Sequence, residues 1–239
     1  MALIDDIIDA ATDDKVPIGT LLRKCLVLEQ QVKNEKFKTW LNRELNGYEK
    51  VEDLPSYRTF RSVSYGIFLG IAGRQLTNQP LSLHVLNGQD RKVVETCPLM
   101  QPAGAYEGRP DKGDDAQLPW NPTLTAKYQQ KFFPGSDMVL NRAWQFIPGS
   151  VLIGLVETVR TNVLRFALDL KDQLGPSALT VDKLPSETVD RSVVTNIYGG
   201  NILIAAHAEN ISQWSQTSIT EGDIQSLIEA LTGLYQSSH

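Results

Sequence analysis

Histidine and cysteine are scarce in this chain, which has three histidines and two cysteines among 239 residues. His84, His207 and His239 stand in unrelated sequence contexts, so neither a histidine-based triad nor a zinc cluster is predicted. Cys25 and Cys97 form no metal-ligand pair and no disulfide framework, which fits a reducing compartment. GxSxG, HExxH and GxxxxGKS/T motifs are absent as well. We therefore expect no catalytic residue, no metal site and no cofactor.

Long apolar runs are missing too. The most apolar stretch, residues 151–174, is interrupted by six charged residues, and the N-terminal residues mix acids with apolar side chains. Neither a transmembrane segment nor a signal peptide is predicted, and we expect a cytoplasmic protein without a membrane partner. The net charge of −5 leaves no general excess of lysine and arginine for phosphate contacts. A nucleic-acid partner is therefore not expected.

The composition, 41% hydrophobic and 21% charged, is that of a folded globular chain. We predict an α+β fold, in which an N-terminal helical bundle packs with a mostly antiparallel sheet and one long helix. Its predicted boundaries are residues 1–175 for the main domain, 176–192 for a linker, and 193–239 for a β-hairpin and helix tail. The linker is predicted because its residues are polar and show no periodicity.

Helical periodicity marks three segments near the N-terminus. Apolar residues recur every three or four positions over residues 3–11 and again over residues 18–32. Asn34 can cap a third helix, and Asn46-Gly47 can end it. The buried face of that helix is formed by Phe37, Trp40, Leu41 and Leu45, and we expect Cys25 in the same core.

The central part of the chain is predicted to be mostly β-structure. Strands are expected at residues 59–71 and 138–147, and a hairpin at 81–86 and 91–95 around Asn87-Gly88. Residues 98–122 carry five prolines and are expected to form a long loop, in which Asp111, Asp114 and Asp115 are solvated charges rather than metal ligands. A long helix, capped by Ser150, is predicted to end at Leu174.

The tail begins with β-type residues around Gly199-Gly200 and ends in a helix that starts at Thr220. One face of that helix carries Ile224, Leu227, Ile228, Leu231 and Leu234. A hairpin and one helix of 47 residues cannot bury much surface alone. We therefore predict that this face drives self-association into a homo-oligomer.

Three motifs follow one another in the first quarter of the chain: LLRKxLxL from Leu21, WLxxELNGY from Trp40, and LPxYR from Leu54. In this order and spacing they resemble the AbiTii domain of bacterial phage-defence systems. The likeness extends over residues 3–174, including the Val159-Arg160-Thr161-Asn162 stretch, and leaves residues 73–131 unmatched. The resemblance implies a role in abortive infection, the halted growth or death of a phage-infected cell, with a defence effector protein as a possible partner.

Arg23, Glu44 and Arg58 are charged residues of these motifs, and each has strongly apolar neighbours. An unpaired charge in such surroundings is costly, so we expect them to pair with one another. The specific prediction is an ion pair between Arg23 and Glu44 that joins the second and third helices.

Two other functions compete with a non-catalytic interaction or regulatory module of this defence system. One is a toxin-type enzyme, such as a nuclease, whose site lies in residues 73–131. The other is a sensor in which the strands and the long loop form a pocket for a nucleotide or a phage molecule.

Overall fold

The computed structural model describes residues 3–107, 115–132, 135, 137–174 and 185–198. The chain divides into two compact units, Met1–Gly200 and Asn201–His239, and every described residue belongs to the first. Helices and antiparallel strands are both present in this unit, so the predicted α+β class is confirmed.

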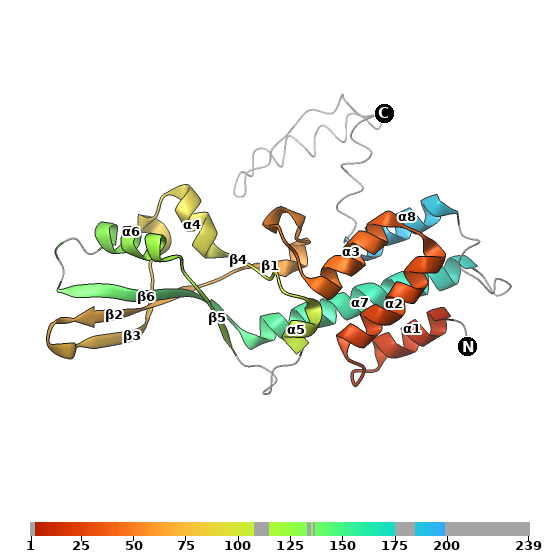
Figure 1. The fold of residues 1–239 in the computed structure, drawn as a ribbon, viewed down its shortest axis with the longest axis horizontal. Helices are drawn as coiled ribbons and strands as arrows, with labels where there is room; N and C mark the ends of the chain where they lie inside the picture. The colour runs from red at the N-terminus through yellow and green to blue at the C-terminus, as the bar shows by residue number, and fades with distance from the viewer. Residues whose placement is uncertain (1–2, 108–114, 133–134, 136, 175–184, 199–239) are drawn as a thin grey trace, which may run out of the picture. The chain divides into compact units, whose positions relative to one another are not determined.

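The helical part of the unit has one apolar core. The helical part consists of α1 (Leu3–Thr12), α2 (Ile18–Val32), α3 (Glu35–Asn46), α5 (Ala103–Glu107), α7 (Gly149–Leu174) and α8 (Ser186–Asn196). α7 packs against α1, α5 and α8, so it is the central element of this part (Figure 1). Buried side chains of the core include Ile7, Ile18, Leu21, Leu22, Cys25, Phe37, Trp40, Val159, Phe166 and Leu170.

The helices predicted from periodicity are confirmed for α1, α2, α3 and α7. Asn34 caps α3 as expected, because its side chain accepts a hydrogen bond of 2.9 Å from the Phe37 amide. Gly47 ends the same helix at a φ of 93°, a backbone angle that favours glycine. Cys25 lies in the core, where burial disfavours the thiolate and raises the pKa of its thiol to about 12.

The sheet part is a four-stranded antiparallel sheet with the order β3-β2-β6-β5. Its strands are β2 (Ser64–Gly70), β3 (Gln75–Pro80), β5 (Ala116–Pro119) and β6 (Met138–Ile147). Two helices, α4 (Gly88–Glu95) and α6 (Pro122–Phe132), lie on one side of it in Figure 1. A second apolar core therefore forms between helices and sheet, from Phe68, Leu86, Val94, Trp120, Leu124, Tyr128 and Leu140.

A junction connects the two parts. β1 (Thr59–Arg61) pairs with β4 (Thr96–Pro98), and Cys97 and Leu99 pack there against Leu152 and Leu155 at the start of α7. β6 ends at Ile147 and α7 begins at Gly149, so sheet and helical bundle share one nearly continuous stretch of chain.

The predicted hairpin at residues 81–95 is wrong. This segment forms a short 3-10 helix, η4 (Leu83–Val85), followed by α4, and His84 lies in η4 rather than in a strand. Asn87 decides the outcome: its side chain accepts a hydrogen bond of 2.7 Å from the Asp90 amide and caps α4 instead of forming a turn.

The long loop and the linker also need correction. Residues 98–122 contain α5 and β5, although residues 108–114 lie outside the described part of the chain. The predicted linker becomes helical at Ser186, and α8 continues through residues 193–196, where the tail was predicted to begin as β-structure. Val189 and Val193 are buried in the bundle, which explains why these residues form a core helix. The rest of the predicted tail, from residue 199, lies outside the described residues.

Candidate functional site

The motif residue Glu44 is fully buried and is surrounded by hydrogen-bond donors. Its Oε1 accepts hydrogen bonds of 2.8 Å from the hydroxyls of Tyr48 and Tyr57, and one of 3.0 Å from Arg58 Nε. Arg58 Nη2 donates to the other carboxylate oxygen. Trp40 completes the group by donating from its indole nitrogen to the Tyr57 hydroxyl at 2.7 Å.

Arg58 uses its remaining donors on the backbone. Its Nη1 donates to the carbonyls of Leu99 and Gln101 at 2.7 and 2.8 Å, and its guanidinium lies 4.8 Å from the centre of the Tyr48 ring. Burial disfavours the charged form, but the hydrogen bonds and charge of Glu44 outweigh it, so the pKa of Arg58 is raised. The network ties α3 to η2 (Ser56–Arg58) and to the segment after β4.

Arg23 does not take part in this network, so the predicted Arg23–Glu44 ion pair is wrong. Arg23 is exposed, and its Nη2 donates to the Thr20 hydroxyl at 3.0 Å on the same helix. The buried stripe of α2 runs through Leu21, Cys25 and Leu28, and position 23 lies off that stripe. Arg58 reaches Glu44 instead, so pairing within the motif charges is confirmed for these two only.

A second buried charge, Arg160, lies where α1, α2 and α7 meet. Its guanidinium donates to the carbonyls of Ala10, Asp13 and Val16 at 3.3, 3.3 and 2.8 Å. A cation at this place complements the C-terminal end of the α1 dipole. Arg160 belongs to the Val159–Asn162 stretch, but its hydrogen-bond partners could not be predicted from the sequence.

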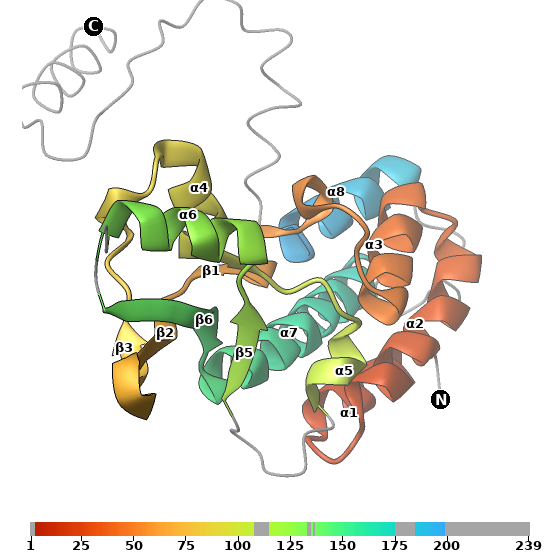
Figure 2. The same cartoon turned by 60° about the vertical axis from the view of Figure 1, so that its left-hand side comes forward.

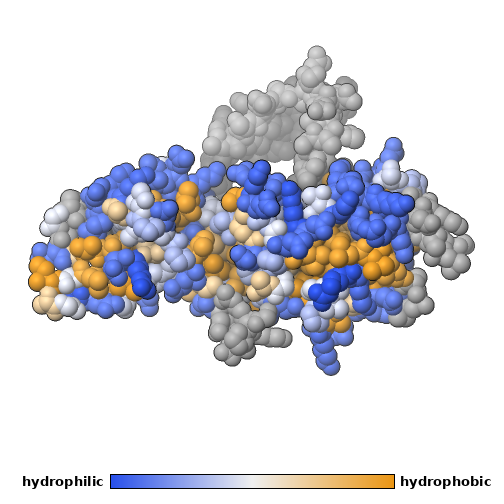
Figure 3. Space-filling view, in the orientation of Figure 1, coloured by the Kyte–Doolittle hydropathy of each residue, from blue (hydrophilic) through white to orange (hydrophobic). Residues whose placement is uncertain are grey.

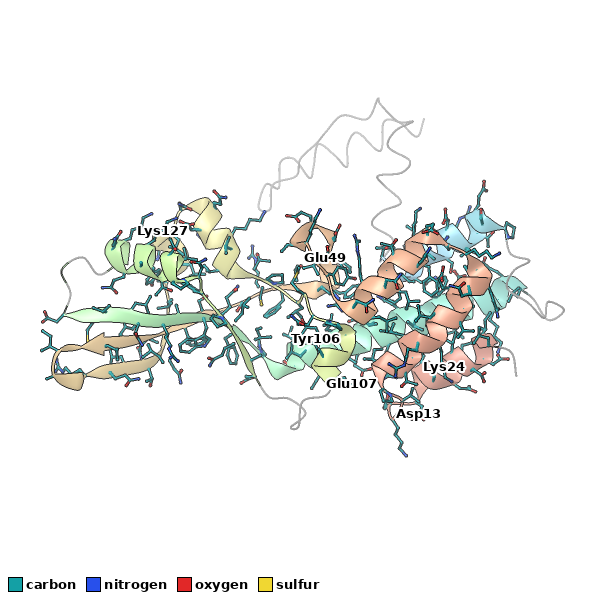
Figure 4. All side chains as sticks on the ribbon, in the orientation of Figure 1. Asp13, Lys24, Glu49, Tyr106, Glu107 and Lys127 are labelled. Atoms are coloured by element: carbon teal, nitrogen blue, oxygen red, sulfur yellow. The ribbon has the colours of Figure 1, made fainter. Side chains whose placement is uncertain are left out.

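Glu107 supplies the opposite charge at the place where α1, α2 and α7 meet. Its carboxylate accepts from the Ile18 amide at 2.8 and 2.9 Å, at the beginning of α2, and lies 3.5 Å from Arg160. Figure 4 shows Glu107 next to the Asp13 end of α1. Sequence reasoning missed Glu107 because it falls in the stretch that was predicted to be a loop.

An open groove with a volume of about 670 Å³ lies between α6 and β5, over the first half of β6. Figure 2 shows α6 running beside β6, whereas β5 diverges from β6 at an angle. The groove overlaps the far end of residues 73–131, where an enzyme site was considered. Its described lining carries one formal charge, that of the exposed Arg142.

Exposed apolar side chains gather on the sheet part. Leu69, Ile71, Leu76 and Val139 are each at least 41% exposed, and Figure 3 shows apolar surface over the β2–β3 end. Exposed apolar surface often marks an interaction site.

Other sequence predictions fall partly outside the described residues. Asp115 is exposed and accepts a hydrogen bond of 3.0 Å from the Gly149 amide at the start of α7, while Asp111 and Asp114 are not described. The self-association face at residues 224–234 also lies outside them. Within the described ranges there is no group of three or more potential metal ligands. No described helix is both long and apolar enough to cross a membrane.

A family model, AbiTii, matches residues 2–197 of the chain. This protein belongs to the AbiTii family. The AbiTii match includes α1 to α8, so the family region extends beyond the likeness over residues 3–174 and contains both the groove and the buried networks. No curated protein and no solved structure matches the chain significantly.

AbiTii membership indicates a role in abortive infection as a form of phage defence. The structure explains the second and third motifs of this AbiTii chain, because Trp40, Glu44, Tyr48, Tyr57 and Arg58 come from them and meet in one buried network. The first motif supplies apolar side chains to the helical core, among them Leu21, Leu22 and Leu28. These motif side chains hold the domain together.

Proposed function

We propose that this AbiTii protein is a non-catalytic interaction and regulatory module of a bacterial abortive-infection system, which assembles through its residues after 198. The observation that carries the proposal is the burial of the motif residues Glu44 and Arg58. They bind each other in the core, where no ligand can reach them, so these two motif charges serve the scaffold. Recognition is then left to the surface and to the tail.

Two features support an assembly role. The exposed apolar side chains on the β2–β3 end offer a contact surface for a defence effector protein. The stripe of Ile224, Leu227, Ile228, Leu231 and Leu234 offers a second one for another copy of the chain. Since α8 belongs to the AbiTii domain, the assembling part narrows to the residues after 198.

Light scattering coupled to size exclusion tests self-association. The intact protein is expected at a mass of at least twice the 26.6 kDa of one chain. Leu227→Asp and Leu231→Asp should return it to one chain mass, because a charge on the apolar stripe opposes burial of that face. Gln225→Asp, which adds the same charge off the stripe, should leave the mass unchanged. An intact protein that stays at one chain mass at high concentration would contradict the proposal.

A growth assay separates this function from the nuclease alternative. A regulatory module expressed alone should leave cell growth unchanged. Growth arrest that disappears when charged residues in 73–131 are replaced by alanine would favour the enzyme.

A further inference from the structure

The groove owes its existence to the short length of β5. β5 pairs only with residues 144–147 of the ten-residue β6, and the chain then turns at Trp120 into α6. The first half of β6 therefore has a strand neighbour on one side, β2, and a helix above its other edge. Floor, strand wall and helix wall enclose about 670 Å³, which lies within the range of small-molecule sites.

The walls of the groove are fixed before any ligand arrives. Gln129 of α6 uses its amide on the β6 backbone, donating to the Met138 carbonyl at 3.1 Å and accepting from the Leu140 amide at 2.7 Å. On the other wall, the Trp120 backbone amide donates to the Ala143 carbonyl at 2.9 Å. Trp120 also packs edge-to-face against Tyr128 at 5.7 Å. A preorganised site avoids the entropy cost of ordering on binding.

The lining combines three kinds of surface. Flat apolar groups come from Pro119, Trp120, Pro122 and Trp144, while Gln117, Gln130 and Asn141 supply amides. Amide side chains both donate and accept, so they can pair with the ring edge of a heterocycle. Arg142 supplies positive charge, and no carboxylate occurs among the described lining residues. The chemistry favours a ligand with a planar polar ring and an anionic group.

We propose that this groove binds a mononucleotide, with the base against the Trp144 wall and the phosphate on Arg142. A single cation suits one phosphate, whereas a nucleic-acid strand requires several cations along its backbone. The site extends the proposed assembly role, because it adds a soluble signal that the AbiTii domain can read. Binding at the groove does not depend on self-association, so either can fail without the other.

Calorimetric titration of the intact protein with AMP, GMP, CMP and UMP tests the site. We expect at least one of them to bind. Arg142→Gln should weaken that binding about tenfold through loss of a charge-assisted hydrogen bond. Ala126→Trp, which fills the groove from α6, should abolish it. Binding by none of the four up to millimolar concentration would overturn the proposal.

Two matched controls keep the test specific. Arg61→Gln removes the same charge from an exposed position on β1, and Thr123→Trp introduces the same side chain at an exposed position of α6 outside the groove lining. Both should bind like the unmodified protein, and equal losses in controls and groove variants would overturn the assignment. A single-stranded oligonucleotide that binds more tightly than every mononucleotide would also overturn it, in favour of a polymer.

Discussion

Glu44 is a charge that the fold holds in its interior by means of Arg58 and two tyrosine hydroxyls. Removing one partner of a buried ion pair leaves the other charge without compensation. We expect Glu44→Gln to lower the free energy of unfolding by about 3–5 kcal/mol in urea titrations. Combining it with Arg58→Met should cost less than the sum of the two single changes. Arg23→Ala, at the exposed motif arginine, should change stability by about 0.5 kcal/mol at most.

The two tyrosines of this network predict an alkaline limit of stability. Burial, together with the charge of Glu44, raises the pKa of Tyr48 and of Tyr57 above the usual value. Their contribution to the free energy of unfolding is therefore complete below about pH 10, the usual pKa of tyrosine in an unfolded chain. It is lost as the pH rises further.

Ultraviolet titration of tyrosinate, followed together with circular dichroism, measures this effect. Tyr48 and Tyr57 should ionise only as the protein unfolds. Tyr48→Phe and Tyr57→Phe should each remove one tyrosine from that late step. Ionisation of all seven tyrosines near pH 10 in a still-folded protein would contradict the prediction.

At the scale of elements, α8 is the helix whose importance is easiest to test. Val193 is completely buried against the bundle, so Val193→Asp places a charge in the core. We expect this variant to unfold or aggregate, as judged by circular dichroism. Thr195→Asp, at an exposed position of the same helix, is the control and should stay folded. A folded Val193→Asp variant would contradict the assignment of α8 to the core and would favour the linker that the composition of this segment predicts.

The cap of α4 gives a second prediction at this scale. Asn87→Ala removes the side-chain acceptor for the Asp90 amide and should cost about 1 kcal/mol in thermal or urea unfolding. Gln89→Ala, one residue inside the first turn and exposed, should have no such cost. No loss from Asn87→Ala would argue against the cap.

These elements also show what sequence can reveal about this fold. α1, α2, α3 and α7 each bury a long apolar stripe, and such periodicity is visible locally. α4 buries only Val94 and α8 follows a polar stretch, so tertiary contacts determine both. The Glu44–Arg58 pair was partly foreseeable, since both residues stand in motifs. The groove was not, because it arises where the short β5 leaves the long β6.

On the scale of the whole unit, the shared stretch of β6 and α7 predicts cooperative unfolding. Leu152 and Leu155 of α7 pack against Cys97 and Leu99, so the sheet part cannot separate without exposing the bundle. We expect tryptophan fluorescence at Trp40, in the bundle, and at Trp144, in the sheet, to change at the same urea concentration.

Single-tryptophan variants provide the measurement. Leu152→Ala should lower both midpoints together, through a loss of about 2–5 kcal/mol. Ile153→Ala, next to it but 44% exposed, is the control and should shift neither midpoint appreciably. Midpoints that differ between the two tryptophans would show that the parts unfold independently.

The side-chain amide of Gln129 affects whether a strand of another protein molecule can add to the edge of β6. It satisfies the Met138 carbonyl and the Leu140 amide, the two positions at which an approaching strand would form its first ladder bonds. A sheet edge with free peptide groups invites strand exchange and fibril growth. Gln129 of α6 thus forms the hydrogen bonds that a neighbouring strand would otherwise form, and it protects the protein against polymerisation through this edge.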